Sequence, residues 1–472
     1  MQHISAQEDY RIEHDLLGEK EVPNAAYYGI QTMRALENFP ITGVPLAHHP
    51  SFIRAFAQVK FAAAEANKEL GLVEEKIAEA IKQACRNIID DQLHDQFVVD
   101  MIQGGAGTST NMNANEVIAN HALELLGREK GEYEFCHPNN HVNCSQSTND
   151  AYPSALKIAI IQSNIALTEE LDGLIQAFRS KAEEFKDVIK MGRTQLQDAV
   201  PITLGQEFEA YSVTLEEEIE RLGQTAELFL ELNMGGTAVG TGINTKSGYR
   251  RIVIEQLRAI TGFPVTRALN LVESTQDTGA FIMYSSALKR LSVKLSKICN
   301  DLRLLSSGPR TGLNEINLPK VQPGSSIMPG KVNPVIPEVM NQITYKVIGN
   351  DLTVTLAAEA GQLQLNVMFP VIAQSLGESI EMLIKGMSIL KSRCIEGITA
   401  NKDRCRELVE NSIGLVTVLV PELGYEVCSN LARQALVENK GIYELVLEKE
   451  LLSQENLNSF LSLESMVGPL ID

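Results

Sequence analysis

Histidine is missing from most of this 472-residue chain, because all eight histidines lie between His3 and His141. Histidine is the side chain that most readily gains and loses a proton near neutral pH. A site built mainly from the later part of the chain must therefore transfer protons through another group. Tryptophan is also absent, but that absence excludes no class of protein.

An excess of positive charge is missing as well. The chain carries 60 Asp and Glu residues against 41 Lys and Arg, which gives a formal net charge of −19. We therefore expect neither nucleic acid nor an anionic membrane as a partner, since both attract basic surfaces. No apolar run approaches the ~18 residues that cross a bilayer, and the polar first residues contain no apolar signal core. These absences favour a cytoplasmic location.

Paired cysteines and metal-binding motifs are also lacking. The seven cysteines are scattered and form no CxxC pair, which indicates reduced, buried thiols in a cytosolic protein. The sequence contains no HExxH motif and no EF-hand loop, so it shows no spacing typical of metal ligands. A GxSxG nucleophile motif is absent too.

Long helical patterns are what the sequence does contain. Apolar residues alternate at spacings of three and four over residues 167–189, 208–229, 284–305 and 372–390. This spacing predicts long helices that pack nearly parallel in a bundle. We expect a mainly α fold with three domains: a mixed, mostly helical domain at 1–146, a central helical bundle at 147–402 and a small helical domain at 403–472. Some helices are too apolar for one monomer, which indicates oligomerisation.

Three short segments rich in hydroxyl and amide side chains interrupt the helical patterns. They are "GGAGTSTNMNANE" (104–116), "NCSQSTNDAYP" (143–153) and "GRTQLQDAVP" (192–201), each ahead of a helical pattern. Taken singly, such residues are most often helix N-caps. Taken together, they favour one shared ligand, a small anion such as a carboxylate, bound by helix N-termini and neutral donors. The candidate residues are Thr108, Ser147, Thr148, Asn149 and Thr194.

A fourth segment, "GSSIMPGKVNP" (324–334), lies in a long loop punctuated by Gly and Pro. It offers Ser325, Ser326, Lys331 and Asn333 but no acid, histidine or cysteine. A valine follows Lys331, so this is no phosphate-binding P-loop. Loops of this length in a folded chain are usually functional. Elsewhere, "GGTAVGTG" (235–242) is a weak dinucleotide signal, because no strand pattern precedes it.

At these four segments the sequence resembles the fumarase/aspartase superfamily, and the resemblance extends over nearly the whole chain. The loop "GSSIMPGKVNP" looks like the signature loop of that superfamily. The aspartase branch is the more similar one. Fumarases resemble "GSGTQSNMNMNE" where this chain has "GAGTSTNMNANE", and they carry Ser-Ser-Asn where it has Ser147-Thr148-Asn149. They also have a Thr-His pair in place of Thr194-Gln195.

The resemblance implies a mainly helical homotetramer whose active sites are shared between subunits. It also implies reversible elimination of ammonia from L-aspartate to give fumarate, with Ser325 as an alkoxide base that removes a Cβ proton. The dicarboxylate would be held by hydroxyl, amide and lysine side chains, namely Thr108, Ser147, Thr148, Asn149, Thr194, Ser326, Lys331 and Asn333. The family's reaction needs no cofactor. Some aspartases respond to divalent metal ions, but no site for one is evident here.

Two other functions stay open at this point. A class II-type fumarase would use the same scaffold on L-malate. A non-catalytic scaffold is the second alternative, since lyases of the wider superfamily serve as lens proteins. One departure concerns Phe369 in "NVMFP", where many aspartases have Glu and fumarases have Lys. It removes no predicted catalytic residue.

Overall fold

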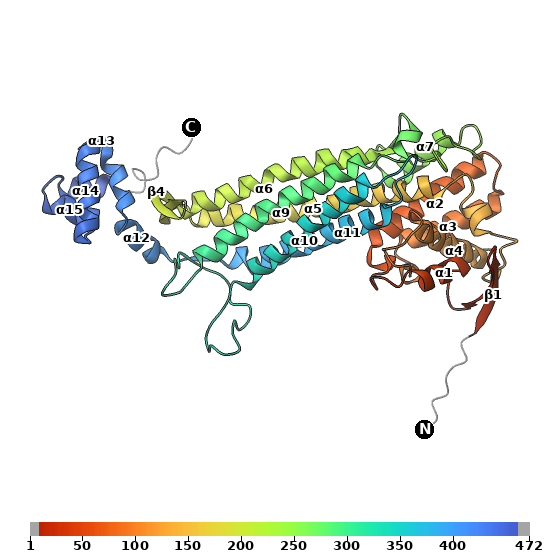
Figure 1. The fold of residues 1–472 in the computed structure, drawn as a ribbon, viewed down its shortest axis with the longest axis horizontal. Coiled ribbons are helices and arrows are strands. Elements are labelled where there is room, and N and C mark those ends of the chain that lie inside the picture. Colours follow the sequence, from red (N-terminus) through yellow and green to blue (C-terminus); the bar gives the residue numbers. More distant parts are fainter. Residues whose placement is uncertain (1–8, 461–472) are drawn as a thin grey trace, which may run out of the picture. The chain divides into compact units, whose positions relative to one another are not determined.

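The structure is a computed structural model that describes residues 9–460. It is mainly helical, as expected, and its elements are drawn in Figure 1. The described chain divides into two compact units. Unit 1 comprises residues 9–168, 220–290 and 346–382, and unit 2 comprises residues 169–219, 291–345 and 383–460. The three-domain division stays a prediction of the sequence.

Five long helices supply residues to both units. They are α5 (Thr148–Glu184), α6 (Leu204–Ala226), α9 (Gly279–Leu305), α10 (Val335–Glu359) and α11 (Phe369–Arg393). The apolar residues predicted at 284–305 all lie on α9, and each is at most 5 % exposed. Their three-four spacing places them on one face of the helix, so the predicted buried stripe is confirmed.

Unit 1 contains the first half of α5 and several shorter helices. They are α1 (Ile30–Asn38), α2 (Pro50–Glu69), α3 (Glu75–Ile89), α4 (Thr108–Leu125), α7 (Tyr249–Thr261) and α8 (Leu271–Ser274). Helix α2 packs on both α3 and α7, and α3 packs on α4. Between the long helices of this unit, Tyr284 on α9 donates a hydrogen bond to Asn164 on α5 (2.9 Å). Asp351 on α10 accepts hydrogen bonds from Ser285 (2.9 Å) and Lys289 on α9 (2.5 Å).

Unit 2 contains the other half of each long helix and the C-terminal helices. The latter are α12 (Lys402–Glu410), α13 (Val420–Leu423), α14 (Tyr425–Glu438), α15 (Ile442–Glu448) and α16 (Gln454–Phe460). Phe178 on α5 packs against Phe208 on α6, with ring centroids 5.9 Å apart. Lys294 on α9 forms an ion pair with Glu217 on α6 (2.7 Å). A separate apolar cluster joins the C-terminal helices to Ile189 and Met191.

The strands of the described residues form short pairs. Strand β1 (Tyr10–Asp15) pairs with β2 (Gly18–Pro23), and β3 (Ile189–Thr194) pairs with β4 (Gln197–Thr203), both antiparallel. Strand β5 (Glu231–Leu232) is parallel to β6 (Thr266–Arg267), and β7 (Ile316–Asn317) is antiparallel to β8 (Thr399–Ala400). These two-stranded pairs hold the ends of loops together, and they do not form a separate sheet layer.

Two details of the predicted helices were wrong. The pattern at 167–189 continues past the end of α5 at Glu184, and Ile189 instead begins β3. Ile189 is buried there because the strand pairing places it in the C-terminal apolar cluster. Thr194 was expected ahead of a helix, but it ends β3 at the turn of a hairpin. None of the described helices is long and apolar enough to cross a membrane.

Candidate active site

The N-terminus of α5 in unit 1 carries three of the predicted site residues. Ser147 precedes the helix and acts as its cap: its hydroxyl accepts a hydrogen bond from the N–H of Asn149 (3.2 Å). In return, the carboxylate of Asp150 accepts the N–H of Ser147 (2.9 Å). This reciprocal pair is a capping box. The capping interpretation of Ser147 is therefore confirmed, and its hydroxyl proton is still free to be donated to a ligand.

A proline one turn further along α5 leaves the carbonyl of Asn149 without its usual helical partner. Pro153 has no N–H, so it cannot bond the carbonyl of Asn149 as a helix residue normally would. The side-chain amide of Asn233 donates to that carbonyl instead (2.9 Å). The side chain of Asn149 in turn donates to the carbonyl of Ala238 (2.7 Å). Helix α5 is thereby joined to the segment 233–238.

Asp150 is a site residue that our sequence analysis missed. It is fully buried, and its second carboxylate oxygen accepts the N–H groups of Gly235 (3.1 Å) and Thr237 (2.9 Å). Burial raises the pKa of Asp150 to about 6. The residue holds the start of α5 and the 235–237 turn together. Its signal was the S-x-x-D pattern of a capping box at 147–150.

A buried lysine lies behind the same helix start. The ammonium of Lys60 on α2 donates to the amide oxygens of Asn111 (2.7 Å), Asn143 (3.0 Å) and Gln146 (2.9 Å). Burial lowers the pKa of Lys60 to about 7. Asn111 on α4 also donates to the hydroxyl of Thr148 (3.2 Å). This network connects the first turn of α4 with the first turn of α5.

Thr108 is the first residue of α4. It is exposed, and its hydroxyl donates to the carbonyl of Gly105 (2.8 Å). The preceding Gly107 has a φ of 92°. A Cβ at that position would come within 2.2 Å of the Tyr152 ring. Tyr152 is buried and makes ring contacts with Phe52 and Phe369, among others. Only glycine fits at position 107, and the loop before Thr108 can therefore lie close against the Tyr152 ring.

Unit 2 contains the loop of Ser325. The Ser325 hydroxyl oxygen accepts two backbone hydrogen bonds, from the N–H of Ile327 (3.2 Å) and of Met328 (2.9 Å). The loop closes through Gly324, whose N–H donates to the carbonyl of Lys331 (2.7 Å) and whose carbonyl accepts from the side chain of Asn333 (2.7 Å). The closure brings Ser325, Lys331 and Asn333 into one small loop.

The remaining side chains of this loop face solvent. Ser326 and Lys331 are exposed. Within residues 9–460, the ammonium of Lys331 has no hydrogen-bond or ion-pair partner. A flexible, fully hydrated cation gains little from its surroundings. Lys331 is therefore available to an incoming anion and contributes little to the fold.

Thr194 lies at the tip of the β3–β4 hairpin and is also exposed. The two turn residues, Gln195 and Leu196, have φ values of 54° and 62° although neither is glycine. Such conformations cost energy and occur often at functional sites. The base of the hairpin is held by Glu315, which is fully buried and pairs with Arg193 (2.8 Å) and Lys190 (3.0 Å). Glu315 immediately precedes β7, at the start of the segment that leads to Ser325.

The described part of the chain contains neither a cluster of metal ligands nor a disulfide. Residues 9–460 contain no group of three His, Cys, Asp or Glu side chains placed to hold a metal ion. All seven cysteines are free, and all but Cys144 are buried. The prediction of reduced, buried thiols is thus confirmed for six of them.

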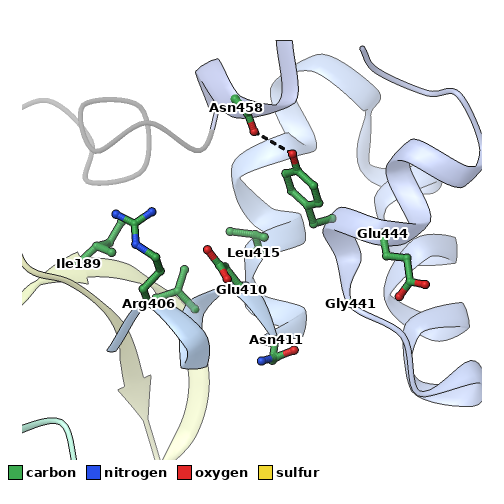
Figure 2. Close-up of a pocket in the computed structure, with 10 residues that line it drawn as sticks. Ile189, Arg406, Glu410, Asn411, Leu415, Gly441, Glu444 and Asn458 are labelled. Atoms are coloured by element: carbon green, nitrogen blue, oxygen red, sulfur yellow. Dashed lines mark hydrogen bonds between the residues drawn. The ribbon is translucent and has the colours of Figure 1, made fainter. Parts of the chain in front are cut away.

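Two cavities show which part of the structure can receive a small molecule. A cavity of about 400 Å³ in unit 1 is lined by Ser147, its neighbour Gln146 and the segment around Thr237. A second, of about 550 Å³, lies in unit 2 among the C-terminal helices (Figure 2). There Tyr443 donates a hydrogen bond to Asn458 (2.9 Å). Neither this second cavity nor two others, of about 470 and 520 Å³, is lined by a predicted site residue, so the first is the candidate substrate site.

Each unit thus carries one part of the predicted site residues. The unit 1 part offers neutral hydroxyl and amide donors at helix N-termini, backed by a buried lysine, and suits a carboxylate. The unit 2 part offers a serine whose oxygen already accepts two N–H groups, as an oxyanion would.

Comparison with known proteins agrees with this chemistry. A lyase family model matches residues 18–349, and a model described as the fumarase C C-terminus matches residues 415–468. The chain belongs to this lyase family, and the resemblance drawn from the sequence is confirmed.

Individual relatives give a more specific comparison than the family models. The chain is 60 % identical to the aspartate ammonia-lyase of Pseudomonas aeruginosa over 97 % of each chain. It is 54 % identical to that of Escherichia coli, over 97 % of this chain and 96 % of the other. Among solved structures, it is similar to a fumarate lyase/delta crystallin from Brucella melitensis bound to cobalt, with a TM-score of 0.95, 54 % identity and coverage of 98 % and 100 %. A class II fumarase from Schistosoma mansoni gives a TM-score of 0.90 at 34 % identity, with coverage of 97 % and 99 %.

Proposed function

We propose that this chain is an aspartate ammonia-lyase, which eliminates ammonia from L-aspartate to give fumarate and catalyses the reverse addition. The observation that carries the proposal is the pair of backbone N–H groups on the Ser325 hydroxyl oxygen. A serine hydroxyl is a weak acid, and donors aimed at its oxygen stabilise the alkoxide form. The relatives at 54–60 % identity over nearly the whole chain support the same reaction.

Ser325 is the base in this mechanism. Its alkoxide removes a proton from the carbon next to the side-chain carboxylate of L-aspartate, and the carboxylate becomes an enediolate dianion. The enediolate then collapses: the carbon–carbon double bond of fumarate forms as the carbon–nitrogen bond breaks and ammonia leaves. Lys331 and Asn333, on the same loop, bind a carboxylate of the substrate. Ser326 lies beside the base and supplies a further hydroxyl.

The unit 1 residues hold the substrate and the developing charge. Thr108, Ser147 and Thr148 donate hydroxyl protons to the carboxylate that becomes the enediolate, with the positive ends of α4 and α5 behind them. Asn149, together with Thr194 of unit 2, binds the remaining polar groups. Interactions that strengthen as charge develops lower the barrier, whereas equally strong binding of the substrate would not.

We further propose that the reaction needs no cofactor. Elimination next to a carboxylate requires charge stabilisation and a base, both of which the chain's own residues supply. A divalent metal ion would act only as an activator, at a site that we do not assign. The free cysteines favour the cytoplasm as the location.

The active unit is a homotetramer with shared active sites, in our proposal. The exposed leucines of α10 support assembly: Leu352 and Leu356 are 61 % and 60 % exposed and lie one turn apart. Leu363, shortly after the helix, is 81 % exposed. An apolar stripe of this kind is typical of a subunit contact. Assembly would also cover the exposed Ser325 loop and exclude water from it.

The test is ultraviolet detection of fumarate formed by the purified chain from L-aspartate and, in parallel, from L-malate. We expect fumarate from L-aspartate alone. Ser325→Ala is expected to lower kcat by at least ~10³-fold, because the base is removed. Ser453→Ala, at a serine of the C-terminal helices, is the control and should leave kcat unchanged.

Other outcomes would identify the alternatives. Faster formation of fumarate from L-malate would establish a fumarase on the same scaffold. Absence of activity on both substrates would favour the non-catalytic scaffold. Full activity of Ser325→Ala would remove Ser325 from the mechanism while leaving the reaction in place.

A further inference from the structure

The glycine-rich segment 235–242 has no role in the mechanism above, yet it lies against the substrate-binding helix start. Asp150 accepts the N–H groups of Gly235 and Thr237 while it also accepts that of Ser147. Asn149 donates to the carbonyl of Ala238. A Cβ at Gly240 would lie 2.4 Å from the backbone of Leu271. Close backbone approach therefore explains this glycine, and no dinucleotide is needed to account for it.

The segment forms one wall of the 400 Å³ cavity in unit 1. Gln146, Ser147, Thr237 and Asn244 are among the residues that line it. Every described polar side chain that lines this cavity is uncharged. A dicarboxylate that enters it therefore meets donors from Asn, Gln, Ser and Thr and no repelling acid. The two oxygens of Asp150 are already occupied by backbone N–H groups.

Thr237 has two features that the fold alone does not explain. Its φ is 55°, in the left-handed region that β-branched residues rarely adopt. Its side chain is 4 % exposed, and its hydroxyl makes no hydrogen bond to any residue of 9–460. A buried hydroxyl without a partner is unfavourable. A residue that combines strain with an unsatisfied donor is typical of a functional site.

The hydroxyl can reach the cavity at little cost. Rotation about the Cα–Cβ bond moves the oxygen of a threonine among three staggered positions. In Thr237 this rotation breaks no hydrogen bond, because the oxygen has none to lose. The methyl group can take the position that the oxygen leaves, so the packing changes little.

We propose that Thr237 is a further substrate-binding residue, whose hydroxyl donates to a carboxylate of the dicarboxylate held at Ser147. The proposal rests on the proposed function and adds a fifth residue to the proposed substrate-binding residues of unit 1. Asp150 is the positioning residue of this arrangement, since it sets the distance between Ser147 and Thr237. The motif 235–242 then has a role: it brings a threonine backbone close to the helix start.

The test compares Thr237→Val, which keeps the shape and removes the hydroxyl, with Thr237→Ser, which restores it. Thr241→Val is the matched control, because Thr241 lies in the same segment, is exposed and does not line the cavity. For Thr237→Val we expect kcat/KM for L-aspartate to fall ~10- to 100-fold, the loss of one hydrogen bond to a charged group. Thr237→Ser and Thr241→Val should stay within a few-fold of the unsubstituted chain.

Thermal unfolding separates binding from a merely structural role. The Tm of Thr237→Val should be unchanged or higher, because an unsatisfied buried hydroxyl has been removed. Unchanged kcat/KM in Thr237→Val, or a loss that Thr237→Ser does not restore, would overturn the proposal. A lowered Tm together with the lowered kcat/KM would also overturn it, since that pattern indicates structural damage.

A second readout keeps this inference distinct from the reaction itself. If the unsubstituted chain is inactive on both L-aspartate and L-malate, the proposed function fails, and succinate then serves as a non-reacting dicarboxylate probe. Succinate should raise the Tm of the unsubstituted chain and of Thr241→Val. A smaller rise in Thr237→Val would support the contact, and an equal rise would refute it.

Discussion

The unit 1 part and the unit 2 part of the predicted site residues differ in how much of their structure the chain itself provides. At the start of α5, Ser147, Asn149 and Asp150 are tied to neighbours by hydrogen bonds, and the charges of Asp150 and Lys60 are buried. The Ser325 loop and the tip of the β3–β4 hairpin are mostly exposed. The Ser325 loop and the hairpin each contain internal hydrogen bonds but lack a covering surface. The residues proposed to bind a carboxylate are thus preformed, whereas the proposed base has its hydrogen-bond donors but not the dry surroundings that make them strong.

This difference indicates what each part requires. A preformed network fails when one of its buried members is removed, because its partners stay desolvated and unsatisfied. An exposed loop fails when the surface that should cover it is lost, although its own fold is intact. Variants in the two parts should therefore affect turnover and stability to different degrees.

The largest effect on turnover is expected from loss of assembly. Leu352→Asp with Leu356→Asp places two charges on the exposed stripe of α10, where burial in a subunit contact would be costly. We expect dissociation in analytical ultracentrifugation and loss of nearly all activity. Leu436→Asp on α14, at a leucine that is 69 % exposed, is the control and should sediment unchanged. Full activity of a dissociated double variant would show that one chain completes the site.

A smaller effect is expected from Lys331→Ala. Removal of one charge-stabilising group should lower kcat/KM by ~10²- to 10³-fold. The Tm should not change, because Lys331 has no described partner to lose. Lys320→Ala, also exposed in the segment that leads to Ser325, is the matched control for charge. A loss of activity in Lys320→Ala as large as that in Lys331→Ala would point to overall charge and away from a specific contact.

The smallest effect on turnover, with the largest on stability, is expected from Glu315→Gln. The change leaves Arg193 without its buried countercharge, whereas Lys190 keeps its ion pair with Glu207 (2.6 Å). It should lower the free energy of unfolding by about 3–5 kcal/mol. Chemical denaturation would measure this, and kcat/KM at low temperature should fall less than in Lys331→Ala. Glu407→Gln, which removes an exposed partner of Arg404, should cost less than about 1 kcal/mol.

The sequence was most informative where a pattern is local. The three-four spacing at 284–305 predicted α9 and its buried face. The capping of α5 by Ser147 followed from residue type. Ser325 was predicted from the resemblance to a family. No local pattern indicates its role, because a Gly-Ser-Ser run by itself predicts only a turn. The roles of the predicted site residues stay predictions until the variants are measured.

The sequence was least informative where partners are distant. Asp150 bonds Thr237 across 87 positions, and Lys60 bonds Gln146 across 86. Neither pairing leaves a local periodic signal. A lysine on an apolar, alanine-rich helix could have been singled out as a buried charge, but its three amide partners could not. The strain at Thr237 depends on a backbone angle that composition does not encode.

The contact between Gly107 and Tyr152 has a consequence for how this loop can change over time. A side chain at position 107 is excluded while the Tyr152 ring lies 2.2 Å from where its first carbon would be. The ring is itself enclosed by Phe52, Phe56 and Phe369. A side chain at position 107 therefore requires a smaller residue at position 152, and the order of the two changes is fixed: position 152 must change first. Libraries that vary only position 107 would return glycine, whereas libraries that vary both positions would not.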